Sequence, residues 1–303
     1  MIQNRTLLAA FLIAIYATII GFTDNFVQVI AEAAGLWQFH VTRTLMALTL
    51  LALVAVPLGL RLRPVNLGAV VARSTIHGLA MVIYFGALAY LPVALVAAGL
   101  FTAPIFVLLI SHFIYGEVIT PLGIFAVVLG FAGAILVLGP EAWAGASLPA
   151  LLPIIAGALY ATGNIATRKW CPQESAETLL GGFFAALGVI GAIGMVVLTL
   201  SPLDPVAGTE GFLQRGPVWP TQSFWFWTFV QAAGSLLAVG LMVRAYQIAP
   251  ATKVAVFEYV ILPASALWSW AIWGEVLTPL SIFGMAMIVA AGVIIAVASQ
   301  NDG

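Results

Sequence analysis

Two ionisable side chains stand inside long apolar stretches of the sequence, where a charge is costly. Glu258 lies eight residues into the stretch 250–273, and His77 lies nine residues into the stretch 68–89. Eight residues of helix cover about 12 Å, so both side chains would lie well inside their helices. A carboxyl group and an imidazole at similar depth could carry a proton or bind an amino or carboxylate group of a small molecule. The alternative is a structural role, either as an ion pair or as a protonated, hydrogen-bonded glutamate.

Further polar and aromatic side chains share helix faces with these two or with one another. Tyr84 follows His77 by two helical turns, and Tyr259 adjoins Glu258. Elsewhere, polar side chains four residues apart share a helix face: Gln231 with Ser235, and Tyr160 with Asn164. Each pair either lines a cavity or forms hydrogen bonds between helices. The candidate set for binding or coupling is Glu258, His77, Tyr84, Tyr259, Tyr16, Tyr160, Asn164, Gln231, Ser235 and Phe101.

Two prolines fall inside apolar stretches and change the local backbone. Pro104 leaves the carbonyl of Leu100 without its helical donor, and Pro263 does the same to Tyr259. Such carbonyls are tolerated at membrane depth only where protein or a watery cavity covers them. Each proline therefore marks either a packing kink or the wall of a cavity.

A pair of opposite charges lies near the ends of the first two apolar stretches. Asp24 is close to the end of the first, and Arg43 is close to the start of the second. The two could form a contact at the rim or gate of a cavity, or simply anchor the two helices.

The composition requires that helices in a lipid bilayer position these side chains. Of the 303 residues, 63% are hydrophobic and 7% are charged, whereas soluble domains carry about 25% charged residues. A helix needs about 20 apolar residues to cross the bilayer core. The sequence therefore predicts an all-α integral membrane protein with ten transmembrane helices. They lie near 7–29, 38–60, 68–89, 92–113, 119–139, 149–168, 178–200, 224–246, 250–273 and 277–298.

Charge, cysteine and histidine content exclude several classes of partner and cofactor. A net charge of −1 offers no basic patch for nucleic acid. The single cysteine, Cys171, cannot form an internal disulfide or a cysteine-based zinc site. The three histidines are scattered and match no metal motif. We expect no metal, cofactor or nucleic acid; the expected partners are the lipid bilayer and a small-molecule substrate.

The distribution of Lys and Arg predicts the orientation in the membrane. With the N-terminus inside, eight of the ten basic residues fall on the cytoplasmic side, and the exceptions are Arg43 and Arg215. Basic loops tend to stay in the cytoplasm. We therefore predict cytoplasmic N- and C-termini, an external loop at 201–223, and a location in the cell (inner) membrane.

A sequence repeat divides the chain into two units. GEVITPLGIF at 116–125 recurs as GEVLTPLSIF at 274–283, with eight identities in ten at an offset of 158. The units 1–145 and 146–303 would each hold five helices. Because five is odd, the second unit must enter the membrane from the opposite side, which gives an inverted repeat. Such repeats are typical of secondary transporters, with the substrate site near mid-membrane.

On these features the sequence resembles the ten-helix, EamA-type branch of the drug/metabolite transporter superfamily. Each unit has a proline in its fourth helix (Pro104, Pro263) and Gly-Glu before its fifth (116–117, 274–275), and Arg43 stands where the family has an arginine. The resemblance implies an exporter or exchanger of small metabolites, commonly amino acids. It also implies a central cavity lined by helices 1, 3, 4, 6, 8 and 9.

The sequence thus favours a secondary transporter rather than an enzyme. Its expected activity is export of small polar or zwitterionic metabolites, such as amino acids, by alternating access. Two repeats in one chain allow a functional monomer. The alternative is an intramembrane lipid-handling protein, either a flippase or a lipid-modifying enzyme.

Overall fold

The computed structural model describes residues 2–87, 91, 93–140, 148–204 and 208–301, and every regular element within these ranges is helical. Ten spans there are long and apolar enough to cross a membrane, which confirms the predicted all-α class and the ten helices. The elements are α1 (Ile2–Asp24), α2 (Val27–Ala33), α3 (Leu36–Leu58), α4 (Leu67–Ala87), α5 (Val93–Leu100), α6 (Ala103–Phe113), α7 (Pro121–Leu138), η2 (Leu148–Ala150), α8 (Leu151–Lys169), α9 (Ala176–Leu200), η3 (Thr209–Phe212), α10 (Gln222–Ile248), α11 (Ala251–Glu258), α12 (Ile261–Trp273) and α13 (Pro279–Asn301).

The first span, predicted near 7–29, extends over Arg5–Ala33 and is interrupted within that length. α1 ends at Asp24, and α2 continues the span to Ala33. The side-chain amide of Asn25 donates to the Gly21 carbonyl oxygen at 2.6 Å, which is the acceptor that the Asn25 backbone would use in a regular helix. Side-chain bonds of this kind compete with helical hydrogen bonds, and they account for the break.

The fourth and ninth spans are also interrupted, close to their prolines. In the fourth, α5 gives way to α6 at Phe101 and Thr102. In the ninth, the Leu262 amide donates to the Tyr259 carbonyl at 3.1 Å. A tighter turn therefore supplies the donor that Pro263 removes.

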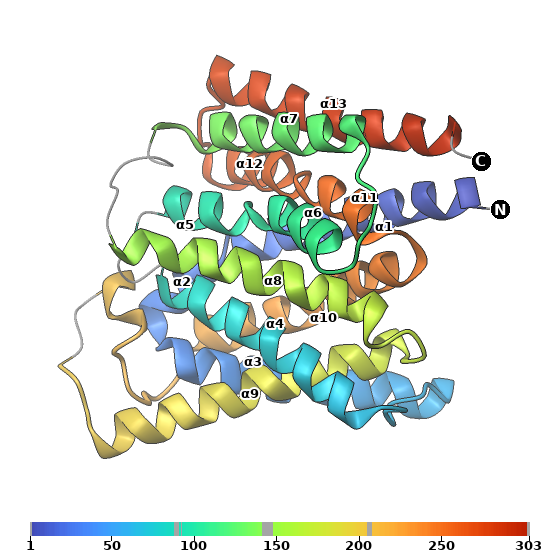
Figure 1. The fold of residues 1–303 in the computed structure, drawn as a ribbon. Helices are drawn as coiled ribbons and strands as arrows, with labels where there is room; N and C mark the ends of the chain where they lie inside the picture. The colour runs from blue at the N-terminus through green and yellow to red at the C-terminus, as the bar shows by residue number, and fades with distance from the viewer. Residues whose placement is uncertain (1, 88–90, 92, 141–147, 205–207, 302–303) are drawn as a thin grey trace.

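The helices form one bundle whose edges are shown in Figure 1. α7 and α13 pack together at one edge, and α3 and α9 lie at the other. Between these edges, α1 packs along α10 and α12. α4 packs along α8 and α9. A Cβ atom on either Gly133 or Gly284 would lie 2.6 Å from the other residue's carbonyl oxygen. Ser281, near the start of α13, donates to the carbonyl of Val137, near the end of α7. These two helices are therefore antiparallel and touch through their backbones.

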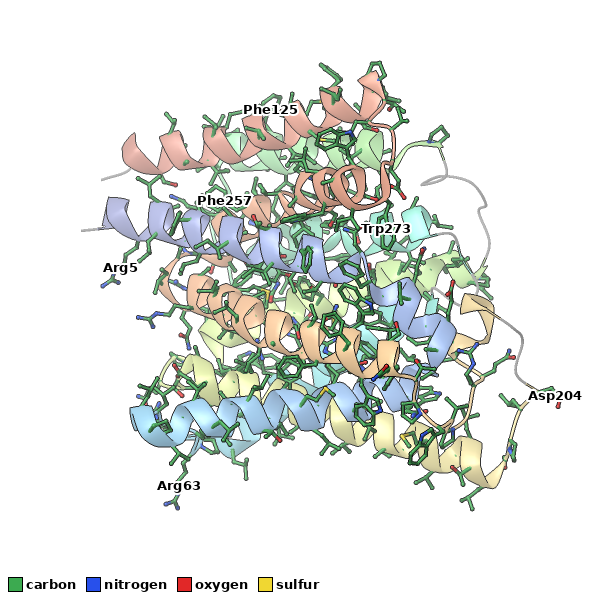
Figure 2. The ribbon with its side chains drawn as sticks, turned by 180° about the vertical axis from the view of Figure 1, so that it is seen from behind. Arg5, Arg63, Phe125, Asp204, Phe257 and Trp273 are labelled. Atoms are coloured by element: carbon green, nitrogen blue, oxygen red, sulfur yellow. The ribbon has the colours of Figure 1, made fainter. Side chains whose placement is uncertain are left out.

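The two ends of the bundle differ in the charges they carry. The start of α1 and the end of α13 lie at the same end (Figure 1). Arg5 and Arg63 project from this end, whereas Asp204 lies at the opposite end (Figure 2). We call the first of these the basic end and the second the distal end.

Candidate functional site

The Glu258 carboxyl group lies at the centre of the bundle and is held by side chains of α8. Glu258 is 4% exposed. Its Oε1 atom accepts from the Tyr160 hydroxyl at 3.4 Å and from the Asn164 side-chain amide at 3.5 Å. Among the described residues the ion pair is formed by Lys169 and Glu117 and does not involve Glu258. The groups that donate to Glu258 are therefore neutral. The expected shared face of Tyr160 and Asn164 is therefore directed at one carboxyl group.

The hydroxyl groups beside Glu258 form a short chain that reaches α1. The Tyr16 and Tyr160 hydroxyl oxygens are 3.3 Å apart, and the Tyr160 hydroxyl also lies 2.9 Å from the Met242 sulfur. A hydroxyl has one proton to donate. When Tyr160 donates to Glu258, its oxygen can accept from Tyr16. The carboxyl group is thereby connected to α1 through two phenols.

His77 is close to this cluster but does not bind Glu258 directly. Its ring meets the Tyr160 ring edge-on, with centroids 4.8 Å apart, and the Phe183 ring at 5.7 Å. Both ring nitrogens are buried without a hydrogen-bond partner among the described residues. The expected His77–Glu258 pair is therefore separated by Tyr160.

Gly163 permits the close approach of α8 to His77, and filling it should destabilise the fold. A Cβ atom there would lie 2.5 Å from His77 Nδ1 and 2.9 Å from its Cγ. Because the ring would have to move, we expect Gly163→Ala to cost about 1–3 kcal/mol. Gly240→Ala is the matched control, since its Cβ would meet the Leu180 Cδ2 atom at 3.6 Å. Thermal unfolding of the purified variants measures the difference; equal midpoints would contradict the prediction.

Asp24 is the centre of a second polar group, nearer the distal end. Its carboxylate accepts from the Gln231 side-chain amide at 2.8 Å. The Arg43 guanidinium acts on Asp24 electrostatically but stacks over the rings of Phe39 and Phe184, at 5.4 and 5.5 Å. The expected Asp24–Arg43 contact thus acts through space rather than as an ion pair.

The other predicted residues lie around these two groups. Tyr84 is half-buried, and it interacts electrostatically with Asp24 and with Tyr16. Ser235 donates to the Gln231 carbonyl in its own helix. Phe101 and Tyr259, at the two proline-associated breaks, face each other with ring centroids 6.2 Å apart.

Tyr259 is directed away from the carboxyl group of its neighbour, towards α7. It is 0% exposed, and a Cβ atom on Gly130 would lie 2.5 Å from its ring. Tyr259 therefore helps to pack the ninth span against α7.

Sequence reasoning missed two residues of α10 that face the Glu258 cluster. The Tyr246 hydroxyl lies close to the Glu258 carboxyl group, although it falls outside regular hydrogen-bond geometry. Met242 contacts Tyr160. Both lie one helical turn apart on the face that already carries Gln231, so the three- and four-residue spacing along α10 was the available signal.

At the basic end, the loops before α4 and α9 are bound together by Glu174. Its carboxylate accepts from the Val65 amide at 2.8 Å and from the Asn66 amide at 2.6 Å. These amides lie just before α4, where the helix dipole favours an anion. The Glu174 carbonyl accepts from the Gln247 side chain at 2.9 Å. We call these contacts, together with the hydrogen bond from Ser175 to the Arg61 carbonyl, the inner closure.

At the distal end, the segment before α10 covers the ends of α2 and α3. Arg215 donates to the carbonyls of Ala31 at 2.6 Å and Ala34 at 3.2 Å, at the C-terminus of α2, where the dipole favours a cation. Gln38 and Val218 exchange two hydrogen bonds of 2.8 and 3.0 Å. We call these contacts the outer closure. The residues of the Glu258 cluster are themselves buried.

Ten membrane-length helices surround a buried cluster of ionisable and hydrogen-bonding side chains, and they define the class: a polytopic membrane protein. Residues 7–139 match the model of the EamA-like transporter family. The matched segment lies within the first of the two predicted units and is similar to that transporter family. The predicted resemblance is thereby confirmed, and so is the prediction that the chain is not an enzyme.

Three relatives and one solved structure illustrate the similarity. The chain is 26% identical to a riboflavin transporter of Brucella anthropi over 69% of each chain. It is 25% identical to the pseudopaline exporter CntI of Pseudomonas aeruginosa over 72% of this chain and 71% of that one. A riboflavin transporter of Vibrio cholerae is 26% identical over 91% of this chain and 90% of its own. A crystal structure of a protein at 17% identity has the same fold, with a TM-score of 0.75 over 98% of this chain and 99% of that one.

Proposed function

We propose that this chain exports small polar or zwitterionic metabolites, amino acids among them, by alternating access. The observation that carries the proposal is the Glu258 carboxyl group, which is buried at the centre of the bundle and bound by neutral donors from Tyr160 and Asn164. An ammonium group of a substrate could replace these long hydrogen bonds. Relatives that transport riboflavin or export pseudopaline support a small-molecule substrate.

We further propose that residues 1–145 and 146–303 are inverted repeats. In support, the offset of 158 relates Leu100 and Ala103, at the break in the fourth span, to Glu258 and Ile261, at the break in the ninth. The same offset relates the first residues of α7 and α13, which run antiparallel. Two similar units of opposite orientation would give nearly equivalent states open to either side.

The two closures support the alternating-access mechanism. The Glu174 contacts hold the basic end and the Arg215 contacts hold the distal end. Each closure consists of a few hydrogen bonds from one charged side chain to backbone groups at a helix terminus. Breaking one while keeping the other would open a path to Glu258 from one side alone.

Transport by the purified protein in liposomes tests the function. Liposomes are loaded with labelled amino acids or with riboflavin, and counterflow is measured against protein-free liposomes. Accumulation of a water-soluble probe supports the proposal. Movement of a labelled phospholipid without any water-soluble probe would favour the flippase alternative instead.

The proposed orientation predicts a specific labelling pattern. In a variant that lacks Cys171, a cysteine at Asp204 should react with a membrane-impermeant maleimide on intact cells. Cysteines at Ile2 and Gln300 should react after the cells are permeabilised, because basic loops tend to remain in the cytoplasm. External labelling at either terminal position would refute the cytoplasmic termini and the inverted arrangement with them.

A further inference from the structure

Arg73 is a cation that is buried inside the bundle. It lies on α4, six residues after the first residue of that helix, and is 1% exposed. Six residues correspond to about 9 Å of helix, so the guanidinium is inside the bundle. Charges at such depth are costly and mark functional sites by default.

The hydrogen bonds of Arg73 leave the guanidinium only partly satisfied. Its Nε donates to the Thr167 hydroxyl at 3.0 Å and its Nη1 to the Leu179 carbonyl at 3.2 Å. Its Nη2 has no partner, and among the described residues no carboxylate lies within ion-pair distance. An arginine carries five N–H donors. Three of them therefore remain for a ligand, in a planar group that suits a carboxylate.

The acceptors that Arg73 uses do not require it. The Thr167 hydroxyl has its own acceptor, the Gly163 carbonyl at 3.0 Å. Leu179 lies inside α9, where the helical backbone supplies a donor to its carbonyl. Arg73 therefore binds groups that would remain satisfied without it, whereas its own charge is left without a counter-ion.

The unpaired cation and the Glu258 carboxyl group are connected through one face of α8. Thr167 contacts Arg73, and Asn164, three residues earlier, contacts Glu258. Three residues are about 4.5 Å of helix. The two ring nitrogens of His77, one turn after Arg73, and the side-chain oxygen of Asn164 have no hydrogen-bond partner among the described residues. A row of unused hydrogen-bonding groups thus extends from the cation towards the anion.

We propose that Arg73 binds an anionic group of the transported substrate, a carboxylate, while a cationic group of the same molecule faces Glu258. The inference rests on the proposed transport function and makes the substrate class narrower: a small zwitterion. A carboxylate would supply the counter-ion that Arg73 lacks and would occupy its free donors. The cation and the anion of the site would then recognise the two ends of one molecule.

The first test separates a binding role from a structural one in the protein without substrate. A guanidinium that awaits a counter-ion contributes little to the empty fold, since removing an uncompensated buried charge is neutral or stabilising. We expect Arg73→Gln to unfold at the same temperature as the wild type or at a higher one. Arg63→Gln is the control, because Arg63 projects from the same end of the bundle without being buried (Figure 2). A clear loss of thermal stability in Arg73→Gln alone would identify Arg73 as a structural anchor and overturn the proposal.

The second test uses matched probes with and without the carboxylate. Counterflow by wild-type proteoliposomes is measured for the L-amino acids, their amides, and riboflavin, which has no carboxylate. Transport should require the carboxylate, and Arg73→Gln should reduce uptake of the amino acids about 30-fold or more, with partial recovery in Arg73→Lys. Equal transport of the amino acids and their amides, or amino-acid uptake that Arg73→Gln leaves unchanged, would overturn the inference while the transport function stands. Failure of the wild type on every probe would instead overturn the proposed function.

Discussion

Glu258→Gln is expected to keep the fold and to reduce transport about 30-fold or more, the effect of removing one partner of a buried, hydrogen-bonded charge pair. The amide has nearly the shape of the carboxyl group, and its oxygen can still accept from Tyr160 and Asn164. It cannot, however, carry a charge towards a cationic substrate group. The structural role of Glu258 would thus survive while the binding role is lost.

The measurement is counterflow of labelled amino acids and riboflavin in proteoliposomes, with thermal unfolding as the control for folding. Glu32→Gln is the matched substitution, because Glu32 is an exposed glutamate in the first span. It should transport like the wild type. Rates between about pH 5 and 8, where an unperturbed imidazole changes charge, reveal whether a proton bound at Glu258 takes part. In that case the pH dependence of the wild type should be lost in Glu258→Gln.

Two outcomes would decide against Glu258 as a binding residue. The first is a stable Glu258→Gln protein that transports every probe at the wild-type rate across this pH range. The second is loss of the folded protein in Glu258→Gln but not in Tyr160→Phe, which removes one donor to the same oxygen. The second result would assign the carboxyl group to packing.

The membrane class and the ten helices could be read from the sequence because apolar length is a strong and local signal. The interruption after Asp24 could not be read from the sequence, because it depends on the hydrogen bond that the Asn25 side chain forms in the folded helix. The breaks at the fourth and ninth spans were signalled by Pro104 and Pro263. The two breaks lie at matching positions of the sequence repeat, so the offset of 158 could have predicted the position of one from that of the other.

The candidate site was predicted in part, and its division into two groups was not. Periodicity correctly placed Tyr160 and Asn164 on one face, but it gave no distance between helices. Tyr84 shares a face with His77, yet two turns of helix bring it within electrostatic range of Asp24. Spacing along one helix cannot distinguish these depths when the neighbouring helices are unknown.

Arg73 shows how one signal can conceal another. Its position near the start of a span places it among the cytoplasmic charges, because the rule on basic loops treats all such residues alike. The structure places it at 1% exposure between α4, α8 and α9. Only the packing of α8 and α9 distinguishes it from Arg63, ten residues earlier, which is exposed.

Breaking the inner closure should make Cys171 react with maleimide about 10- to 100-fold faster. Cys171 is the chain's single cysteine and is 1% exposed. Its carbonyl accepts from the Glu174 amide at 3.2 Å, so it lies within the loop that Glu174 holds. Hydrogen bonds to a charged group contribute about 1.5–3 kcal/mol, and each 1.4 kcal/mol changes an opening equilibrium about tenfold. Glu174→Ala removes those to Val65 and Asn66.

The chemistry of the thiol gives the direction of the pH effect. Burial raises the pKa of the Cys171 thiol, the Arg73 charge lowers it, and the Glu174 charge raises it. The thiolate is the reactive form, so the closed state reacts slowly at neutral pH for two reasons: little access and little thiolate. Opening increases access and returns the pKa towards its usual value, and both changes raise the rate.

Glu174→Ala also removes a charge near the thiol, so its electrostatic effect must be separated from opening. Gln247→Ala does this, because it breaks the 2.9 Å hydrogen bond to the Glu174 carbonyl and leaves the carboxylate in place. Losing one neutral hydrogen bond of about 1 kcal/mol should still raise the labelling rate several-fold. The rates are measured on detergent-purified protein from pH 6 to about pH 9, a range that includes the ordinary thiol pKa. Loss of the Glu174 charge alone shifts only the midpoint of the curve, whereas opening also raises its upper limit. If Glu174→Ala shifts only the midpoint and Gln247→Ala labels like the wild type, these contacts do not control access at the basic end.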